Sequence, residues 1–309
     1  MKIFTRMLAV LFPVYICLPL KAYTQQEPQY TQYMYNTLTV NPGYTGTAGS
    51  PDAVLLHRTQ WVGIDGAPRT QAFSIHTPIF GERIGVGLSA VNDRIGPSDE
   101  FYVDGNFSYI IPLGYTSKLA FGLKMGARVL SIDWSRGKFY QEGDPLLNDN
   151  INSRIRASLG SGIYYYTDKC YAGFSIPNFI RSERYDDIEE ATVADRLHYY
   201  IIGGYVFTIT DNIKFKPAVL AKLVSGAPVT ADFSANFLLQ EKVTLGVSYR
   251  WDDSVSALAG FQITNSIFAG YSYDYSVTEL NKYNNGSHEF ILKFSLQPKT
   301  TRMKSPRFF

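Results

Sequence analysis

Residues that could carry out catalysis or bind a metal are scattered along this sequence. The histidines do not show the spacing of a metal site such as His-x-x-x-His, and the two cysteines do not form a Cys-x-x-Cys pair. The histidines are His57, His76, His198 and His288. Gly160-Ser161-Gly162 lacks the full Gly-x-Ser-x-Gly pattern of a nucleophile, and Gly85 and Gly87 lack the rest of a dinucleotide-binding fingerprint. We therefore predict no enzyme activity, no metal and no cofactor.

Arg58 is the residue best placed for an electrostatic role. In an extended strand Arg58 and Gln60 share one face, while His57 and Thr59 share the other. A guanidinium on the interior face would pair with interior carboxylates. The alternation of later strands offers as candidates Asp104, Asp232, Asp274 and Glu289. Such a network would either stiffen the fold or bind a ligand, and the sequence leaves both roles open.

The elements that must position these side chains are strands, because apolar and polar residues alternate with a period of two from Ala53 onward. The clearest example is 118–129, where leucine, phenylalanine and methionine occupy one face and Lys118, Lys124 and Arg128 occupy the other. A helix would mix these two sets, whereas a strand separates them. We predict fourteen strands, which start near Ala53, Gln71, Arg83, Tyr102, Lys118, Arg154, Cys170, Leu197, Ile213, Val229, Val243, Val255, Ser266 and His288.

The connections between these strands alternate between short and long. Short turns include 113–117 and 167–169, and the longest links are 133–153, 178–196 and 276–287. Short turns at one rim, long loops at the other and an even strand number are typical of an all-β, transmembrane antiparallel up-and-down β-barrel of the outer membrane, with both termini periplasmic. A soluble double sandwich or propeller also alternates apolar and polar residues along its strands. Its connections need not alternate in length, however, and its apolar face should be richer in branched aliphatics than in Tyr and Gly.

Composition narrows the classes of protein further. A hydrophobic content of 45% and a mean hydropathy of −0.10 exclude a helical membrane protein. Charged residues make up 18% of the chain, below the roughly 25% of ordinary soluble domains, and aromatic residues make up 15%. Lys and Arg total 29 against 27 Asp and Glu. Without the three basic residues of the first 24 positions the balance is 26 against 27, which argues against a nucleic-acid partner.

The chain divides into four predicted segments, which are a signal peptide (1–24), a leader that lies in the periplasm or plugs the lumen (25–52), the outer-membrane barrel (53–296) and a basic C-terminal tail (297–309). The signal peptide has basic Lys2 and Arg6, an apolar run, and small residues before Gln25. Cys17 leaves with the signal, so Cys170 alone remains and no internal disulfide can form.

The region before residue 100 carries five motifs in a fixed order. They are Q-Y-T-Q-Y-M-Y-N (29–36), N-P-G-Y-T-G (41–46), R-T-Q-W-V-G-I-D-G-A-P (58–68), H-T-P (76–78) and N-D-R-I-G (92–96). This set resembles the PorP/SprF family of Bacteroidetes outer-membrane proteins, which belong to the type IX secretion system. The positions that the resemblance marks for contacts with a partner or a plug are Gln32, Tyr33, Asn36, Asn41, Pro42, Tyr44, Gly46, Arg58, Gln60, Trp61, Gly63, Gly66 and Pro68.

The resemblance implies a barrel that docks periplasmic parts of the secretion machinery and supports delivery of proteins with C-terminal signal domains to the cell surface. Implied partners are other type IX components, including periplasmic and outer-membrane lipoproteins, together with secreted cargo or, in gliding motility, one surface adhesin. Outer-membrane lipid would surround the barrel. A passive transporter of small or hydrophobic solutes is the alternative. The lumen separates the two functions, because transport needs an open or gated path.

Overall fold

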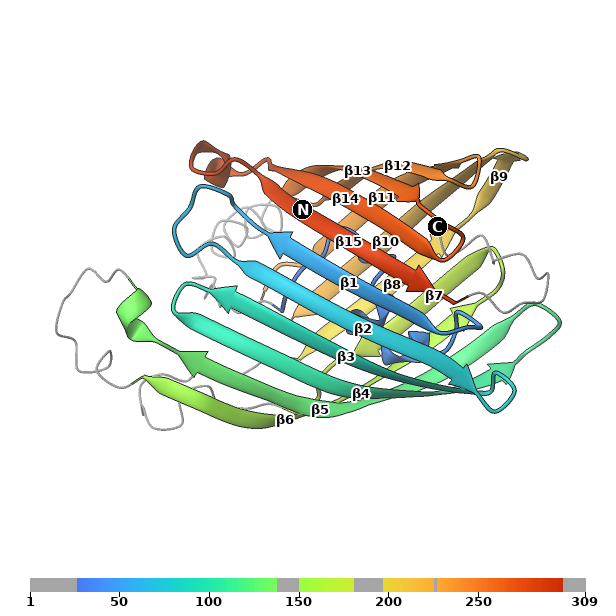
Figure 1. Ribbon diagram of the computed structural model, residues 1–309, viewed down its shortest axis with the longest axis horizontal. Helices are drawn as coiled ribbons and strands as arrows, with labels where there is room; N and C mark the ends of the chain where they lie inside the picture. Colours follow the sequence, from blue (N-terminus) through green and yellow to red (C-terminus); the bar gives the residue numbers. More distant parts are fainter. Residues whose placement is uncertain (1–26, 138–149, 181–196, 225–226, 297–309) are drawn as a thin grey trace, which may run out of the picture.

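The strands form one closed barrel. The computed structural model describes residues 27–137, 150–180, 197–224 and 227–296. The antiparallel sheet closes because β1 (Asp52–Thr59) pairs with β15 (Ser287–Ser295) and β10 (Ile213–Val224) pairs with β11 (Thr230–Leu239) (Figure 1). The other strands are β2 (Arg69–Ile79), β3 (Ile84–Ile95), β4 (Ser98–Pro112), β5 (Lys118–Ile132), β6 (Ile151–Tyr166), β7 (Cys170–Ile176), β8 (His198–Tyr205), β9 (Phe207–Thr210), β12 (Val243–Arg250), β13 (Ser254–Gln262) and β14 (Ile267–Ser276).

Fourteen strand positions make up the wall, which confirms the number predicted from the sequence. β8 and β9 both pair with β10 and are two parts of one wall position, separated by Val206. β8 pairs with β10 up to Gly204 and β9 resumes the pairing at Phe207, so the ladder with β10 is broken at Tyr205 and Val206, where the Val206 N–H donates instead to the carbonyl of Lys169 over 2.8 Å. Past the break, β9 pairs with β10 alone.

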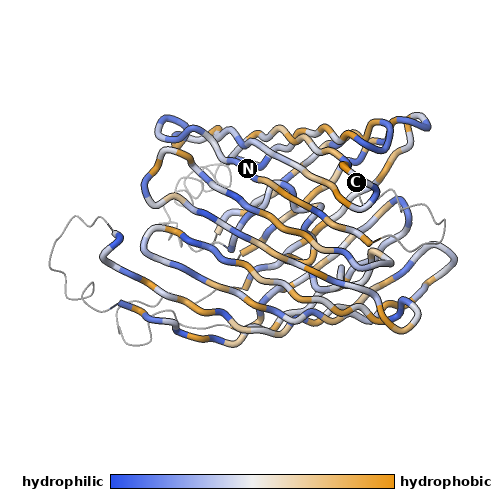
Figure 2. Tube along the Cα trace, viewed as in Figure 1, coloured by the Kyte–Doolittle hydropathy of each residue, from blue (hydrophilic) through white to orange (hydrophobic). Residues whose placement is uncertain are grey.

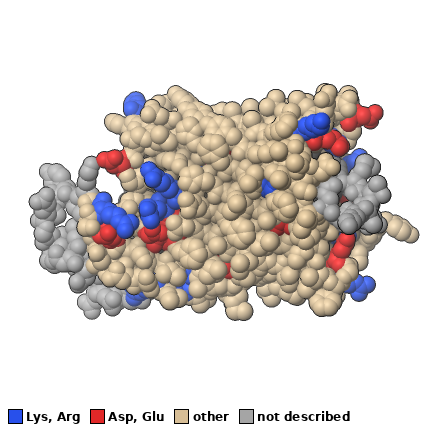
Figure 3. Space-filling model, in the orientation of Figure 1, with Lys and Arg blue, Asp and Glu red and all other residues tan. Residues whose placement is uncertain are grey.

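The two faces of the wall differ in polarity. In β5, Leu123 and Met125 are exposed on the outside, whereas Lys124 and Arg128 are buried inside. Figure 2 shows the same alternation of apolar and polar residues along the strands. On the face drawn in Figure 3, charged residues gather toward the two ends of the barrel and are sparse between them. An apolar outer band with a polar interior is the pattern of a barrel that faces lipid.

Loop length separates the two rims of the barrel. The short-turn rim carries 80–83, 113–117, 167–169, 211–212, 240–242 and 263–266. The described parts of the long-loop rim are 60–68, 96–97, 133–137, 150, 177–180, 197, 227–229, 251–253 and 277–286. The short helices η2 (Trp134–Arg136) and η4 (Glu279–Lys282) belong to the long-loop rim. Every connection longer than five residues lies at this rim, as the predicted alternation of links requires.

The leader lies inside the barrel. Two short helices, α2 (Thr37–Val40) and η1 (Pro42–Tyr44), stand in the lumen, and nearly every residue of 30–47 is buried (Figure 1). No helix among the described residues is both long enough and apolar enough to cross a bilayer. The predicted signal peptide, 1–24, and the basic tail, 297–309, lie outside the described residues.

Candidate functional site

The leader crosses the lumen from the long-loop half to the short-turn rim. Its first described residue, Glu27, contacts Arg128, near the long-loop end of β5. At the other end, the Gly46 N–H donates to Nδ1 of His76 over 3.1 Å, near the short-turn end of β2. The ring of Tyr44 also lies edge-on to the His76 ring, 5.2 Å between centroids. The described leader therefore runs along the lumen and fills it.

A buried ionic cluster lies where the wall meets the part of the leader nearer the long-loop rim. Arg58 of β1 is 1% exposed, and its Nη2 lies 2.6 Å from Oδ2 of Asp274 in β14. Its Nη1 lies 3.1 Å from Oε2 of Glu289 in β15 and donates to Oγ1 of Thr31 in the leader over 2.9 Å. Arg58 and Glu289 are direct partners in the β1–β15 register, so closing the barrel creates this pair.

The leader backbone completes the cluster. The N–H groups of Thr31 and Gln32 donate to the two carboxylate oxygens of Glu289 over 2.9 and 2.8 Å. The Thr31 hydroxyl donates to Oδ2 of Asp274 over 2.7 Å, and the Gln32 side-chain amide donates to the Glu289 carbonyl over 3.3 Å. Hydrogen bonds to a charged acceptor are about twice as strong as neutral ones. The cluster thus ties the leader to both strands that flank the closure.

A turn at Asn41–Gly46 fixes the lower part of the leader. Oδ1 of Asn41 accepts from the Gly43 N–H over 2.8 Å, and its Nδ2 donates to the Ile163 carbonyl of β6 over 3.1 Å. Pro42 lies in the first turn of η1, where its missing N–H leaves no donor unpaired. Gly46 has a φ of +73°, a conformation that favours glycine. The Asn-Pro-Gly part of the second motif is therefore a capped helical turn held against the wall.

Polar side chains of the first motif bond across the lumen between these two anchors. Tyr33 is fully buried, and its hydroxyl lies 3.2 Å from Oγ of Ser234 in β11. Oδ1 of Asn36 accepts from Oγ of Ser74 in β2 over 3.1 Å. β2 and β11 lie far apart in the order of strands around the wall. The leader therefore contacts widely separated parts of the barrel.

Glycines in the wall allow the leader to approach closely. A Cβ placed on Gly122 of β5 would lie 2.1 Å from the nitrogen of Gly43 and 2.2 Å from the carbonyl carbon of Pro42. A Cβ placed on Gly85 of β3 would lie 2.3 Å from the carbonyl oxygen of Thr45. Backbone atoms cannot yield as a flexible side chain can. Any larger residue at either position must displace the leader.

The remaining motif positions form the β1–β2 loop at the long-loop rim, and they are Gln60, Trp61, Gly63, Gly66 and Pro68. The Gln60 N–H donates to the Pro68 carbonyl over 2.9 Å, and the Trp61 N–H donates to Oγ of Ser287 over 3.1 Å. Gly66 has a φ of +73° and Gly63 one of +103°. The motif positions therefore fall into two places, the lumen with Arg58 and this loop.

Two of the four candidate carboxylates pair with Arg58, and the other two do not. Asp104 lies 3.1 Å from Nζ of Lys124, and Asp232 lies 2.7 Å from Nε of Arg250. Each of the four is therefore paired with an interior cation, as a stabilising network requires. Among the residues that the structure describes, no group of three or more His, Cys, Asp or Glu side chains could hold a metal ion.

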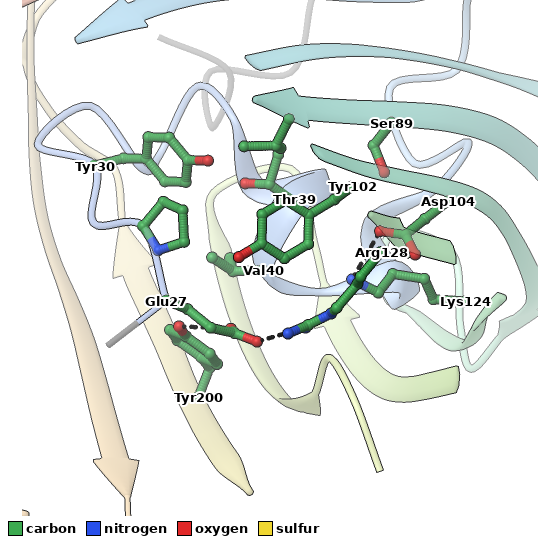
Figure 4. Close-up of a pocket in the computed structure, with 12 residues that line it drawn as sticks. Glu27, Tyr30, Thr39, Val40, Ser89, Tyr102, Asp104, Lys124, Arg128 and Tyr200 are labelled. Atoms are coloured by element: carbon green, nitrogen blue, oxygen red, sulfur yellow. Dashed lines mark hydrogen bonds and ion pairs between the residues drawn. The ribbon is translucent and has the colours of Figure 1, made fainter. Parts of the chain in front are cut away.

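The upper lumen contains a small cavity beside Glu27. Its volume is about 40 Å³, which has room for a few water molecules. Figure 4 shows the Glu27 carboxylate between Arg128 and Tyr200, with Tyr102 and Lys124 at the cavity wall. Oε1 of Glu27 accepts from Nη2 of Arg128 over 2.8 Å, and Oε2 accepts from the Tyr200 hydroxyl over 3.1 Å. Sequence reasoning missed Glu27, because the leader has no periodicity that assigns a side chain to a partner.

The Glu27 ion pair predicts a dependence of stability on acidity. Burial raises the pKa of the Glu27 carboxyl. The positive charge of Arg128, with His198 and Lys124 nearby, outweighs burial and holds this pKa well below its ordinary 4.5. A depressed pKa contributes stability that is complete above the unfolded-state value and is lost as the pH falls toward the folded-state value. We expect Glu27→Gln to reduce the unfolding free energy by a constant amount between about pH 5 and 8 and by less below pH 4.5.

Chemical unfolding of the barrel in detergent, measured across this pH range, checks the Glu27 prediction. Glu82→Gln is the matched control, because the Glu82 carboxylate pairs with Lys118 at the exposed short-turn rim. Its effect should be small throughout. A difference between Glu27→Gln and the unsubstituted protein that widens on acidification would contradict the assignment.

A match to a known family decides what kind of protein carries this site. The family is described as "Type IX secretion system membrane protein PorP/SprF", and the match covers residues 22–294. The chain belongs to the PorP/SprF family. This PorP/SprF chain is thus a membrane protein of the type IX secretion system, and its closed barrel is the form in which strands cross an outer membrane. None of the curated proteins compared with it matches.

Several solved outer-membrane barrels are similar to this PorP/SprF chain in architecture. A FadL homologue from Pseudomonas aeruginosa is 12% identical, with a TM-score of 0.47 over 89% of this chain and 95% of that chain. The CymD monoaromatic hydrocarbon channel is 9% identical, with a TM-score of 0.48 over 88% of this chain and 94% of that chain. Omp33 from Acinetobacter baumannii is 10% identical, with a TM-score of 0.40 over 81% and 100%. Similarity at this level has no bearing on cargo or ligand.

Proposed function

We propose that this PorP/SprF protein is a docking barrel, which holds periplasmic parts of the type IX machinery at the outer membrane and supports delivery of cargo with C-terminal signal domains to the cell surface. It has no catalysis of its own under this proposal. Periplasmic partners contact the short-turn rim. The secreted partners are many cargo proteins in general secretion, or one surface adhesin in a dedicated role.

The filled lumen is the observation that favours docking over transport of solutes. Residues 27–47 lie inside the barrel. They are fastened by the Arg58 cluster toward the long-loop rim and by the turn against Gly122 and Gly85 toward the short-turn rim. The cavity of about 40 Å³ beside Glu27 is too small for a solute larger than a few waters. A passive transporter would need the leader to leave, which would break both anchors.

The orientation belongs to the same proposal. Short turns of outer-membrane barrels face the periplasm and long loops face outside. β15 ends at the short-turn rim, which supports a periplasmic C-terminus. The leader instead reaches from that rim into the long-loop half of the lumen at Glu27. A periplasmic position for the N-terminal side therefore has no support from the described residues.

Deletion of the gene, followed by fractionation and quantification of proteins that carry type IX C-terminal signals, tests this function. We expect such proteins to accumulate in the periplasm and to be depleted at the cell surface. Loss of many of them indicates a general component, and loss of a single surface protein indicates a dedicated partner. Normal surface delivery of all of them, together with a defect in solute uptake, would overturn docking in favour of transport.

A further inference from the structure

The outer face of β2 and β3 changes character in three rows toward the long-loop rim. Side chains that are paired across these two strands point outward from the barrel. From mid-wall toward the rim, the pairs are Phe73 with Ala90, Gln71 with Asn92, and Arg69 with Arg94. The first pair is apolar, the second carries two amides, and the third carries two guanidinium groups. The face is thus layered from apolar to hydrogen-bonding to cationic.

The middle row lies at membrane depth. β1 next to it has 8 residues, which at about 3.3 Å per residue and a tilt of about 40° rise roughly 20 Å, less than the apolar band of about 25 Å. The whole outer face of β1 is therefore needed to cross the band. His57 of β1 points outward directly opposite Gln71. The row of His57, Gln71 and Asn92 consequently lies where acyl chains meet headgroups, and the arginines lie just above it.

A groove of about 580 Å³ runs across this part of the wall. Exposed Leu55, Phe101 and Phe290 line it together with Gln71 and Asn92, and Phe101 lies directly opposite Asn92 in the β3–β4 register. In the part of the chain that the structure describes, neither amide has a hydrogen-bond partner. At the edge of the apolar band a polar group without a partner is costly, because water reaches it only in part. A ligand that offers hydrogen-bonding groups at this level would remove that cost.

The cationic row has a free charge. Arg94 pairs with Asp99, whose Oδ2 accepts from Nε of Arg94 over 3.0 Å. Arg69 is exposed and has no partner among the described residues. Figure 3 shows charged side chains at the long-loop end of this face and few charges in the middle of the wall. An anion just above the groove would meet the unpaired Arg69 first.

We propose that this face binds one phosphoglycolipid of the outer leaflet. Its phosphate lies at Arg69 and Arg94, its amide and hydroxyl groups lie at Gln71 and Asn92, and its acyl chains lie in the groove. A lipid of the lipid A type presents phosphate, hydrogen-bonding groups and acyl chains in this order from water inward, which matches the three rows. A protein segment crossing the membrane would have no reason to follow that order.

Titration of the purified barrel in detergent with monophosphoryl lipid A, followed by native mass spectrometry, tests the site. We expect Arg69→Gln and Gln71→Leu each to weaken binding about tenfold, because each loses a hydrogen bond at the site and Arg69 also loses an ionic contact. Arg83→Gln is the matched control, since Arg83 is exposed on the short-turn rim and lies away from the groove. Gln71→Leu should fold normally, because leucine suits a lipid-facing position.

Two results would overturn the lipid site. One is equal affinity for lipid A in Arg69→Gln, Arg83→Gln and the unsubstituted protein. The other is lipid A binding no tighter than phosphatidylethanolamine. A photo-crosslinking residue at position 71 decides between lipid and protein in cells, because a lipid adduct supports the proposal and capture of another polypeptide refutes it.

Discussion

Arg58→Ala is expected to lower the free energy of unfolding of the barrel by about 3 to 5 kcal/mol, because it leaves two buried carboxylates without their cation. Asp274 and Glu289 both lose this partner, and both are nearly inaccessible to water. The leader is affected too, since Thr31 accepts a hydrogen bond from Arg58. Urea unfolding of the refolded barrel in lipid vesicles, followed by tryptophan fluorescence, measures the change.

Arg136→Ala is the matched control for the Arg58 prediction. Its guanidinium pairs with Asp133 in a half-exposed position, and such pairs contribute about 1 kcal/mol or less. The triple variant Arg58→Leu, Asp274→Asn, Glu289→Gln should recover part of the loss, because neutral partners no longer carry a buried charge. If Arg58→Ala were no more destabilising than Arg136→Ala, the cluster would not hold the barrel and leader together.

The Arg58 cluster shows what alternation in a sequence can and cannot predict. A period of two assigns each side chain to the interior or the exterior, so it correctly places Arg58 and four candidate carboxylates inside. It cannot choose among the four, because that depends on which strands become neighbours when the barrel closes. Glu289 faces Arg58 only because β1 pairs with β15, across 231 positions of the sequence. The strand count and the long and short rims, which are local properties, follow directly from the pattern.

The path of the leader could not be predicted for a different reason. Residues 27–51 have neither strand nor helix periodicity, and their partners are wall positions as far away as Glu289. Gly85 lies in a strand of the wall, and the reason for a glycine there is the leader carbonyl at Thr45. The family resemblance marked Gln32 and Asn41 for contacts with a partner or plug. Only the folded structure shows that these two residues belong to the plug and contact the barrel wall.

Gly122→Val is expected to displace the leader and open the lumen. The new Cβ would lie 2.1 Å from the nitrogen of Gly43, and neither backbone can move without breaking other bonds. The wall is held on both sides of Gly122 by pairing with Ser108 and Gly162, whereas the leader turn has far fewer bonds. The leader therefore yields. Overpacking of this kind costs about 1 to 3 kcal/mol or more, and its visible consequence is ion conductance through the barrel in planar bilayers.

Gly105→Val separates displacement of the leader from a general effect of a bulky residue in the wall. Gly105 lies in β4, next to β5, but it points outward, and a Cβ there would come no closer than 3.6 Å to another atom. We expect this variant to stay closed, with the residual conductance of the unsubstituted protein. Equal conductance in the Gly122 and Gly105 variants would mean that the leader does not seal the lumen. Docking would then lose the observation that favours it over transport, because a barrel that already conducts can pass solutes without the leader leaving the lumen.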